Sequence, residues 1–546
     1  MSPGGSRAVT AAAPPAGRGP DNCGSLAGEL VDAMARRPWG EVAPSVYETG
    51  RLVAVAPLLA GHAERVAFLL RHQRADGAWG PPEGYALVPT LSATDALLAA
   101  LADEGLPADA RPASAAAVGR GLRALSTLLA AGSAVPDTPA ADLIVPALVE
   151  SINARTSGPD AAVPVTHPLS LPTGTDRRRL TAVRAAHAAG TELHPKLAHF
   201  GELLDGTAQR WPRPRAAEPT TVGASPAATA AWLATAGPDA DAPAARVFLE
   251  RLISEGGGPV PCPTPITVFE RAWVLSWLSR AGIGVRPPEA VLAGLADAVG
   301  PAGAATGAGL LPDADTTAVT LYALGRLGRP LDPASLWGYE TAEGFCTWPG
   351  EDGFSVTTNA HVLDALAQHA ARDAGAGSRH RTAIGRLARV LRERQEADGS
   401  WRDRWHASPY YATACCVLAL AESTPDDDSV GAVGRAVRWV LANQRDDGSW
   451  GRWGGTAEET AYALHILLAV PSDVPAVAVA ARRASAYLRA NVHRREHPPL
   501  WYGKELYCPT TIVRSVVLAA SHLARSRLDI RRGGAHVMTG RQKSAT

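Results

Sequence analysis

Residues 444–451 read Gln444-Arg445-Asp446-Asp447-Gly448-Ser449-Trp450-Gly451, and variants of this stretch occur at 73–80 and 395–401 of the 546-residue chain. Each copy follows a segment whose apolar residues recur at helical spacing. Its Asp-Gly pair favours a turn, because glycine accepts a positive φ. The Gln amide can link the ends of neighbouring helices, and the Trp ring can pack over it. Three copies therefore predict a repeat of stacked helix pairs.

The rest of the chain shows the same helical periodicity. Apolar residues recur at this spacing in segments separated by Gly/Pro turns, for example 93–103, 316–328, 358–370 and 509–525. Strand patterns are scarce. The sequence predicts a nearly all-α protein that is long enough for two or three domains.

Composition excludes several classes of function. The 53 basic and 53 acidic residues balance, so no nucleic-acid partner is indicated. No run of 18 apolar residues occurs, which argues against a membrane span. The six cysteines lack C-x-x-C pairs and read as reduced thiols of a cytoplasmic protein. Residues 1–24 have no signal-peptide core, and both they and 531–546 are predicted to be disordered tails.

A short acidic run carries the chemistry. Residues 311–320 read Leu-Pro-Asp-Ala-Asp-Thr-Thr-Ala-Val-Thr. In an extended segment Asp313 and Asp315 project to the same side and can face one cavity. Two carboxyls in a poorly solvated pocket cannot both ionise, so one keeps a proton that can be given to an alkene. The alternative is that Asp315 and the following threonines form an ordinary helix N-cap, whose dipole favours the ionised carboxylate.

Together with the repeats and the acidic run, other segments resemble the class II terpene cyclases, and in particular the copalyl diphosphate synthases, along most of residues 40–525. The segments that carry this resemblance are 45–49, 145–150, 199–202, 225–230, 269–273, 405–411 and 501–507. The resemblance implies two α/α-barrel domains, called β and γ, with the active site between them. We expect 25–60 to be the first helices of the β domain, 61–268 the inserted γ domain, and 269–530 the rest of the β domain.

The resemblance also implies an activity: cyclisation of geranylgeranyl diphosphate to a bicyclic diphosphate, with ent-copalyl diphosphate favoured. Halimadienyl, terpentedienyl or other copalyl products remain open, as does a non-catalytic helical scaffold. No Asp-Asp-x-x-Asp motif is convincing, since 426–428 lies in a polar turn, so the diphosphate should be retained. The product would then pass to a separate class I diterpene synthase. A homodimer is left open.

Roles for the acidic run follow from the same resemblance. Asp315 matches the general acid of the family and Asp313 a supporting carboxylate, whereas Thr316 stands where the third carboxylate usually lies. His199 matches a histidine that positions the water for the final deprotonation. Cys262 replaces the asparagine that partners this histidine, so the terminating base stays undecided.

The remaining candidates bind substrate. Lys196 and Lys504 are two of only three lysines in the chain and are candidate diphosphate contacts, with chance retention as the alternative. Mg²⁺ is the expected cofactor, and the candidate ligands, which could equally be surface carboxylates, are Asp142 and Glu150. The candidate cation-stabilising aromatics, for which ordinary core packing is the alternative, are Trp348, Tyr410 and Trp501.

Overall fold

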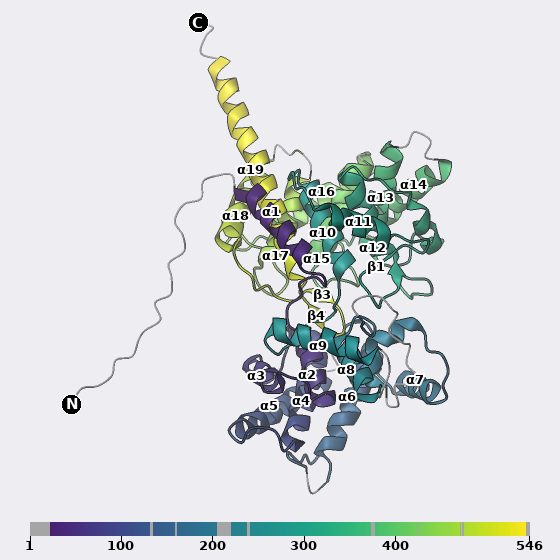
Figure 1. Cartoon of the computed structure of the whole chain (residues 1–546). Helices are drawn as coiled ribbons and strands as arrows, with labels where there is room; N and C mark the ends of the chain where they lie inside the picture. Colours follow the sequence, from purple (N-terminus) through teal and green to yellow (C-terminus); the bar gives the residue numbers. More distant parts are fainter. Residues whose placement is uncertain are drawn as a thin grey trace, which may run out of the picture.

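The computed structural model describes residues 22–541 apart from 131–134, 159–160, 205–219, 237–240, 373–376, 425, 470 and 472–473. Its helices form two bodies stacked on each other (Figure 1). The smaller one, here called the inserted barrel, comprises α2 (Val46–Val55), α3 (His62–Arg71), η1 (Glu83–Ala86), α4 (Leu87–Ala102), α5 (Ala110–Ala130), α6 (Ala141–Thr156), α7 (Arg178–Ala188), η2 (Pro195–Leu203), α8 (Pro226–Thr235) and α9 (Ala242–Gly256).

The larger body, here called the C-terminal barrel, also contains the first helix of the chain. It comprises α1 (Asn22–Arg36), α10 (Thr267–Arg280), α11 (Glu289–Ala298), β1 (Ala304–Ala305), β2 (Pro312–Asp313), α12 (Ala314–Arg326), η4 (Pro333–Tyr339), α13 (Val356–Arg372), α14 (Ser378–Glu393), α15 (Pro409–Ser423), α16 (Asp427–Ala442), α17 (Ala457–Leu468), α18 (Pro475–Asn491), β3 (Trp501–Tyr502), β4 (Leu506–Tyr507) and α19 (Thr510–Arg541). The strands form two antiparallel pairs, β1 with β2 and β3 with β4. The all-α prediction is confirmed.

The chain passes from one barrel to the other earlier than predicted. Apolar side chains of α1, such as Leu30 and Met34, belong to the core of the C-terminal barrel, where α1 packs on α19. Tyr47 and Val53 of α2 instead belong to the core of the inserted barrel, against α4. The expected boundary at residue 60 is therefore wrong, because the apolar face of α2 is buried in the inserted barrel.

The repeat acts as a staple between helices, as the sequence predicts. In the third copy Gln444 Nε2 donates to the carbonyl oxygens of Gly448 and Ala480, at 3.0 Å each, while Trp450 Nε1 donates to Val440 O at 2.8 Å. The first and second copies make the same bonds through their own Gln and Trp side chains. Gly448 has φ +87°, and a Cβ there would meet Arg483 O at 2.9 Å. Each staple ties the turn after one helix to a helix of the next pair: α3 to α5, α14 to α16, and α16 to α18.

Serine N-caps place several helices of the family-like segments. Ser45 accepts a hydrogen bond from Glu48 N, Ser225 from Ala228 N, and Ser408 from Tyr410 N. Such caps satisfy backbone donors that a helix start leaves unpaired. In α8 and α15 the next residue is proline, whose fixed φ suits the first helical position.

Two predictions concern the ends of the chain. Most of the predicted N-terminal tail lies outside the described residues, and α1 begins at Asn22. The C-terminal tail predicted from 531 stays a prediction; in the structure α19 is assigned as far as Arg541. Among the described residues, one segment (Glu83–Ala102, which forms η1 and α4) is long and apolar enough to cross a membrane, but 83 % of its 18-residue apolar window is buried inside the protein.

Candidate active site

A cavity of about 400 Å³ lies between the two barrels, within the range of small-molecule sites. Both barrels contribute to its wall. Side chains that the following paragraphs discuss and that line it are Arg179, Lys196, His199, Phe269, Asp313, Asp315, Thr316, Trp348, Glu351, Arg404, Tyr411, Trp501 and Tyr502. The cavity therefore joins segments that lie more than 300 residues apart in the sequence.

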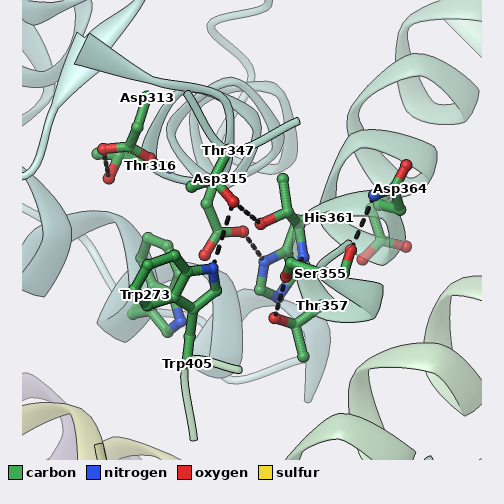
Figure 2. Close-up of polar contacts among 12 residues, drawn as sticks. Trp273, Asp313, Asp315, Thr316, Thr347, Ser355, Thr357, His361, Asp364 and Trp405 are labelled. Carbon is green, nitrogen blue, oxygen red and sulfur yellow. Dashed lines mark hydrogen bonds and ion pairs between the residues drawn. The ribbon is translucent and has the colours of Figure 1, made fainter. Parts of the chain in front are cut away.

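Asp313 ends β2 and is the N-cap residue of α12. Its carboxylate accepts from Thr316 N at 2.6 Å and from Thr316 Oγ1 at 2.8 Å (Figure 2). The side chain is buried, and this burial, with a smaller contribution from the charge of Asp315, raises the pKa of Asp313 from 3.8 to about 7. Asp313 thus holds the start of the helix that carries Asp315.

Asp315 lies in the first turn of α12 and has a different partner. Its Oδ1 lies 2.6 Å from Nδ1 of His361, which projects from α13 (Figure 2). Both side chains are largely buried, with exposed fractions of 15 % for Asp315 and 11 % for His361. Burial disfavours the charged imidazole, but the Asp315 carboxylate outweighs this effect and raises the pKa of His361 well above its usual value. Asp315 therefore sits beside an imidazolium.

The two aspartates face one cavity, as expected, but they are not bonded to each other among the described contacts. The N-cap is Asp313 rather than Asp315. Thr316 supplies its amide and hydroxyl to Asp313. Sequence reasoning missed His361, because a histidine within an amphipathic helix belongs to no recognisable motif.

His199 lines the cavity from the inserted barrel. Its Nδ1 lies 2.5 Å from Gly223 O, which can only accept, so Nδ1 carries the hydrogen and Nε2 is an acceptor. Burial, followed by the charge of Lys504, lowers the pKa of His199 to about 3. The ring is therefore neutral. Cys262 is buried, but it does not line the cavity.

The two candidate lysines occupy different environments. Lys196 lines the cavity, with Nζ 4.4 Å from the ring centroid of Trp348, and burial lowers its pKa. Lys504 is fully buried and pairs with Glu48 at 2.7 Å and Glu202 at 2.8 Å. The structure therefore contradicts the expected diphosphate contact of Lys504, because two carboxylates already surround its ammonium group.

The aromatic candidates divide in the same way. Trp348 and Trp501 line the cavity. Tyr410 does not: its ring packs against Trp439, with centroids 4.6 Å apart, on the outer side of α15. The next residue, Tyr411, points the other way and lines the cavity. Consecutive helix positions are about 100° apart, so the segment was identified correctly and the residue within it was not.

The expected magnesium ligands do not form a metal centre. Asp142 lies 2.6 Å from Arg179, and Glu150 lies 2.9 Å from Arg184. Both carboxylates are about half exposed, and neither lines the cavity. Across the described ranges, no group of three or more His, Cys, Asp or Glu side chains is placed to hold a metal ion. These two residues do not fit the role, and no chemical step is assigned to a metal here.

A carboxyl that lines an aromatic cavity between two α/α barrels, with an imidazolium beside it, defines an acid site for an apolar ligand. Comparison with known proteins agrees. Residues 351–495 match the family described as the squalene-hopene cyclase C-terminal domain. The chain is 42 % identical to an ent-copalyl diphosphate synthase of Streptomyces sp. strain KO-3988, over 93 % of this chain and 98 % of that protein.

Two further relatives extend the comparison. A labda-7,13-dienyl diphosphate synthase of Streptomyces clavuligerus is 41 % identical over 94 % of this chain and 95 % of its own. The solved structure of an ent-copalyl diphosphate synthase from Streptomyces platensis superposes with a TM-score of 0.87 and 41 % identity, over 92 % and 99 % of the two chains. The chain belongs to the copalyl diphosphate synthase family of class II diterpene cyclases, so the resemblance seen in the sequence and the predicted fold class are both confirmed.

Proposed function

We propose that this enzyme converts geranylgeranyl diphosphate into ent-copalyl diphosphate by protonating the terminal alkene. The observation that supports this most directly is that Asp315 lines the cavity between the barrels and lies 2.6 Å from Nδ1 of His361. The relatives support this product, because the Streptomyces sp. protein and the solved Streptomyces platensis structure are both named ent-copalyl diphosphate synthases.

Asp315 is the group we assign as general acid. In the reactive form this ion pair has taken up one further proton: Oδ1 accepts from the His361 imidazolium, and the other carboxyl oxygen carries the proton that goes to the alkene. The terminal double bond takes this proton, and the positive charge moves inward as two rings close. Loss of a ring-adjacent proton then restores neutrality. The adjacent imidazolium favours the transfer, because it stabilises the carboxylate that Asp315 becomes.

His199 is our candidate for the end of the reaction. Its neutral ring carries an acceptor nitrogen at Nε2, which can bind the water that removes the final proton. Cys262 supplies no second polar group to the cavity, so this site differs from the histidine–asparagine pair expected from the resemblance. This difference makes labda-7,13-dienyl diphosphate the second candidate product, since a relative of nearly equal identity, 41 % against 42 %, is named for it.

The diphosphate group is expected beside the cationic side chains of the cavity wall. Arg179, Lys196 and Arg404 all line this cavity. Arg404 forms ion pairs with Glu351, at an N···O distance of 3.2 Å, and with Asp137 of the inserted barrel, at 3.1 Å. Phosphate oxygens are preferred ligands of Mg²⁺, so we expect the ion to bind together with the substrate.

A product that keeps its diphosphate suits a separate class I synthase, and a cytoplasmic location agrees with six unpaired cysteines.

The test is incubation of the purified chain with C15, C20 and C30 substrates, with Mg²⁺ or with a chelator, followed by phosphatase treatment and chiral gas chromatography. We expect only the C20 diphosphate to give a bicyclic alcohol. Asp315→Asn should lower kcat by roughly 10²–10⁴-fold, whereas the exposed Asp297→Asn on α11 should match the wild type. Conversion of squalene, or release of pyrophosphate, would contradict the proposal.

A further inference from the structure

Glu458 is a fully buried carboxylate behind the cavity wall that none of the steps above uses. It lies in the first turn of α17. Its Oε1 accepts from Trp501 Nε1 at 2.9 Å, from Tyr462 OH at 3.0 Å and from His406 Nε2 at 3.2 Å. Its Oε2 is also buried and has no hydrogen-bond partner among the described residues.

The charge of this carboxylate is not balanced by a cation. His406 Nδ1 accepts from Ser408 N at 3.0 Å, so this nitrogen is unprotonated and the hydrogen of the neutral ring is on Nε2. All three donors to Glu458 are therefore neutral. In the part of the chain that the structure describes, no lysine or arginine forms an ion pair with Glu458. Glu458 lies at the positive end of the α17 helix dipole.

The carboxylate is connected to the cavity through aromatic rings. Trp501, which donates to it, lines the cavity and packs against Tyr411 with centroids 4.7 Å apart. Phe269 lines the same wall, and its ring centroid lies 5.5 Å from that of Trp501. The ring contacts continue toward Asp315. The centroid of the Trp273 ring lies 4.3 Å from that of Phe269 and 5.4 Å from that of His361, the partner of Asp315. Glu458 thus lies behind Trp501, at one end of this series of ring contacts, and Asp315 lies at the other end.

We propose that Glu458 is a positioning residue that makes this wall attractive to positive charge. It fixes the indole of Trp501 by a charge-assisted hydrogen bond, which draws electron density into the ring. It also places an uncompensated negative charge in a medium of low polarity, where electrostatic attraction is strong. A carbocation that forms as the rings close is stabilised by both effects. The inference rests on the proposed function, since it needs a cationic intermediate.

Glu458→Gln removes the charge and can keep the hydrogen bonds. The amide oxygen can accept from the same three donors, and the amide nitrogen takes the place of Oε2, which no donor faces. The measurement is calorimetric binding of two substrate analogues, one with a tertiary ammonium in place of a cationic carbon and one with the neutral carbon. We expect the Kd of the ammonium analogue to rise roughly tenfold and that of the neutral analogue to change less than twofold.

Turnover gives a second readout. Glu458→Gln should lower kcat roughly 10- to 100-fold with an unchanged KM, and raise the share of monocyclic diphosphates released before the second ring closes. Tyr462→Phe is the matched control, because it removes one hydrogen bond to Glu458 and leaves the charge. It should keep the wild-type ratio of the two Kd values.

Equal weakening of both analogues by Glu458→Gln, or an unchanged ratio, would overturn the inference and leave a packing role. If this variant does not fold, Trp501→Phe decides: loss of the indole donor should weaken the ammonium analogue several-fold more than the neutral one, and equal weakening contradicts the inference. A wild type that makes no bicyclic product would instead refute the proposed function. The binding measurements need no turnover, so the two failures are distinguishable.

Discussion

At the scale of single residues, the start of α12 divides two aspartates between two tasks. Asp313 is turned back to the helix start and accepts from the amide and hydroxyl of Thr316, whereas Asp315 points to His361 on the next helix. Their separation of two positions allows both to face the cavity. The helix that begins between them then gives each its own partner.

The raised pKa of Asp313 predicts a pH-dependent stability. Burial raises this pKa from 3.8 to about 7, so between these values the folded protein holds a proton that the unfolded chain releases. The resulting stabilisation is complete below pH 4 and is lost as the pH rises to 7. Relative to Asp313→Asn, which can still cap the helix, the wild-type free energy of unfolding should fall by up to about 1.4 kcal/mol per pH unit between pH 5 and 7.

Urea unfolding of both proteins at pH 5, 6, 7 and 8 measures this difference. Between pH 7 and 8 the difference should level off, because the folded and unfolded states then hold the same number of protons at this site. A difference that stays constant from pH 5 to pH 7 would show that Asp313 is ionised throughout.

At the scale of elements, the three Gln–Trp staples predict a local effect on stability. Gln444→Ala removes two hydrogen bonds to backbone carbonyls, those of Gly448 and Ala480. We expect a loss of about 1–3 kcal/mol in the free energy of unfolding of the C-terminal barrel. Gln73→Ala breaks the equivalent bonds in the inserted barrel and serves as the comparison.

Thermal unfolding and the product profile measure the two variants. Both should lower the melting temperature and leave the products unchanged, because the staples lie outside the cavity. A changed product from Gln444→Ala would mean that this staple shapes the site, contrary to the purely structural role assigned to it.

At the scale of the whole molecule, a buried ionic network joins the barrels around Lys504. This residue lies between β3 and β4 of the C-terminal barrel and bonds Glu48 of α2, Glu202 of η2 and Ser225 at the start of α8. Tyr47 OH also donates to Glu202, at 2.7 Å. The hairpin that carries Lys504 contributes Trp501 and Tyr502 to the cavity wall, so the network fixes both the interface and the site.

Lys504→Met should therefore weaken the interface strongly. It leaves two buried carboxylates without their cation, which costs about 3–5 kcal/mol in comparable cases. We expect a lower midpoint of urea unfolding and faster proteolysis between the barrels. The triple variant Lys504→Met, Glu48→Gln, Glu202→Gln should recover much of the loss, since it buries no charge. Equal stability of the single variant and the wild type would contradict this account of the interface.

The sequence predicted those features that short local patterns encode. The staples, the all-α class and the acidic run at Asp313 and Asp315 each follow from spacing within a few residues. His361 and Glu458 could not be found in this way, because their roles come from contacts with side chains 46 and 43 positions away. Lys504 was misjudged for the same reason. Its rarity drew attention, but its partners come from the other barrel.

One consequence of the topology concerns the order in which the protein is made. The first helix, α1, packs on α19, which begins at Thr510, and every residue of the inserted barrel is translated between them. At about 5–20 residues per second, a ribosome needs on the order of half a minute or more to span that interval. The inserted barrel can thus mature on the nascent chain while α1 still lacks its docking surface. A chaperone that shields α1 would act during this delay.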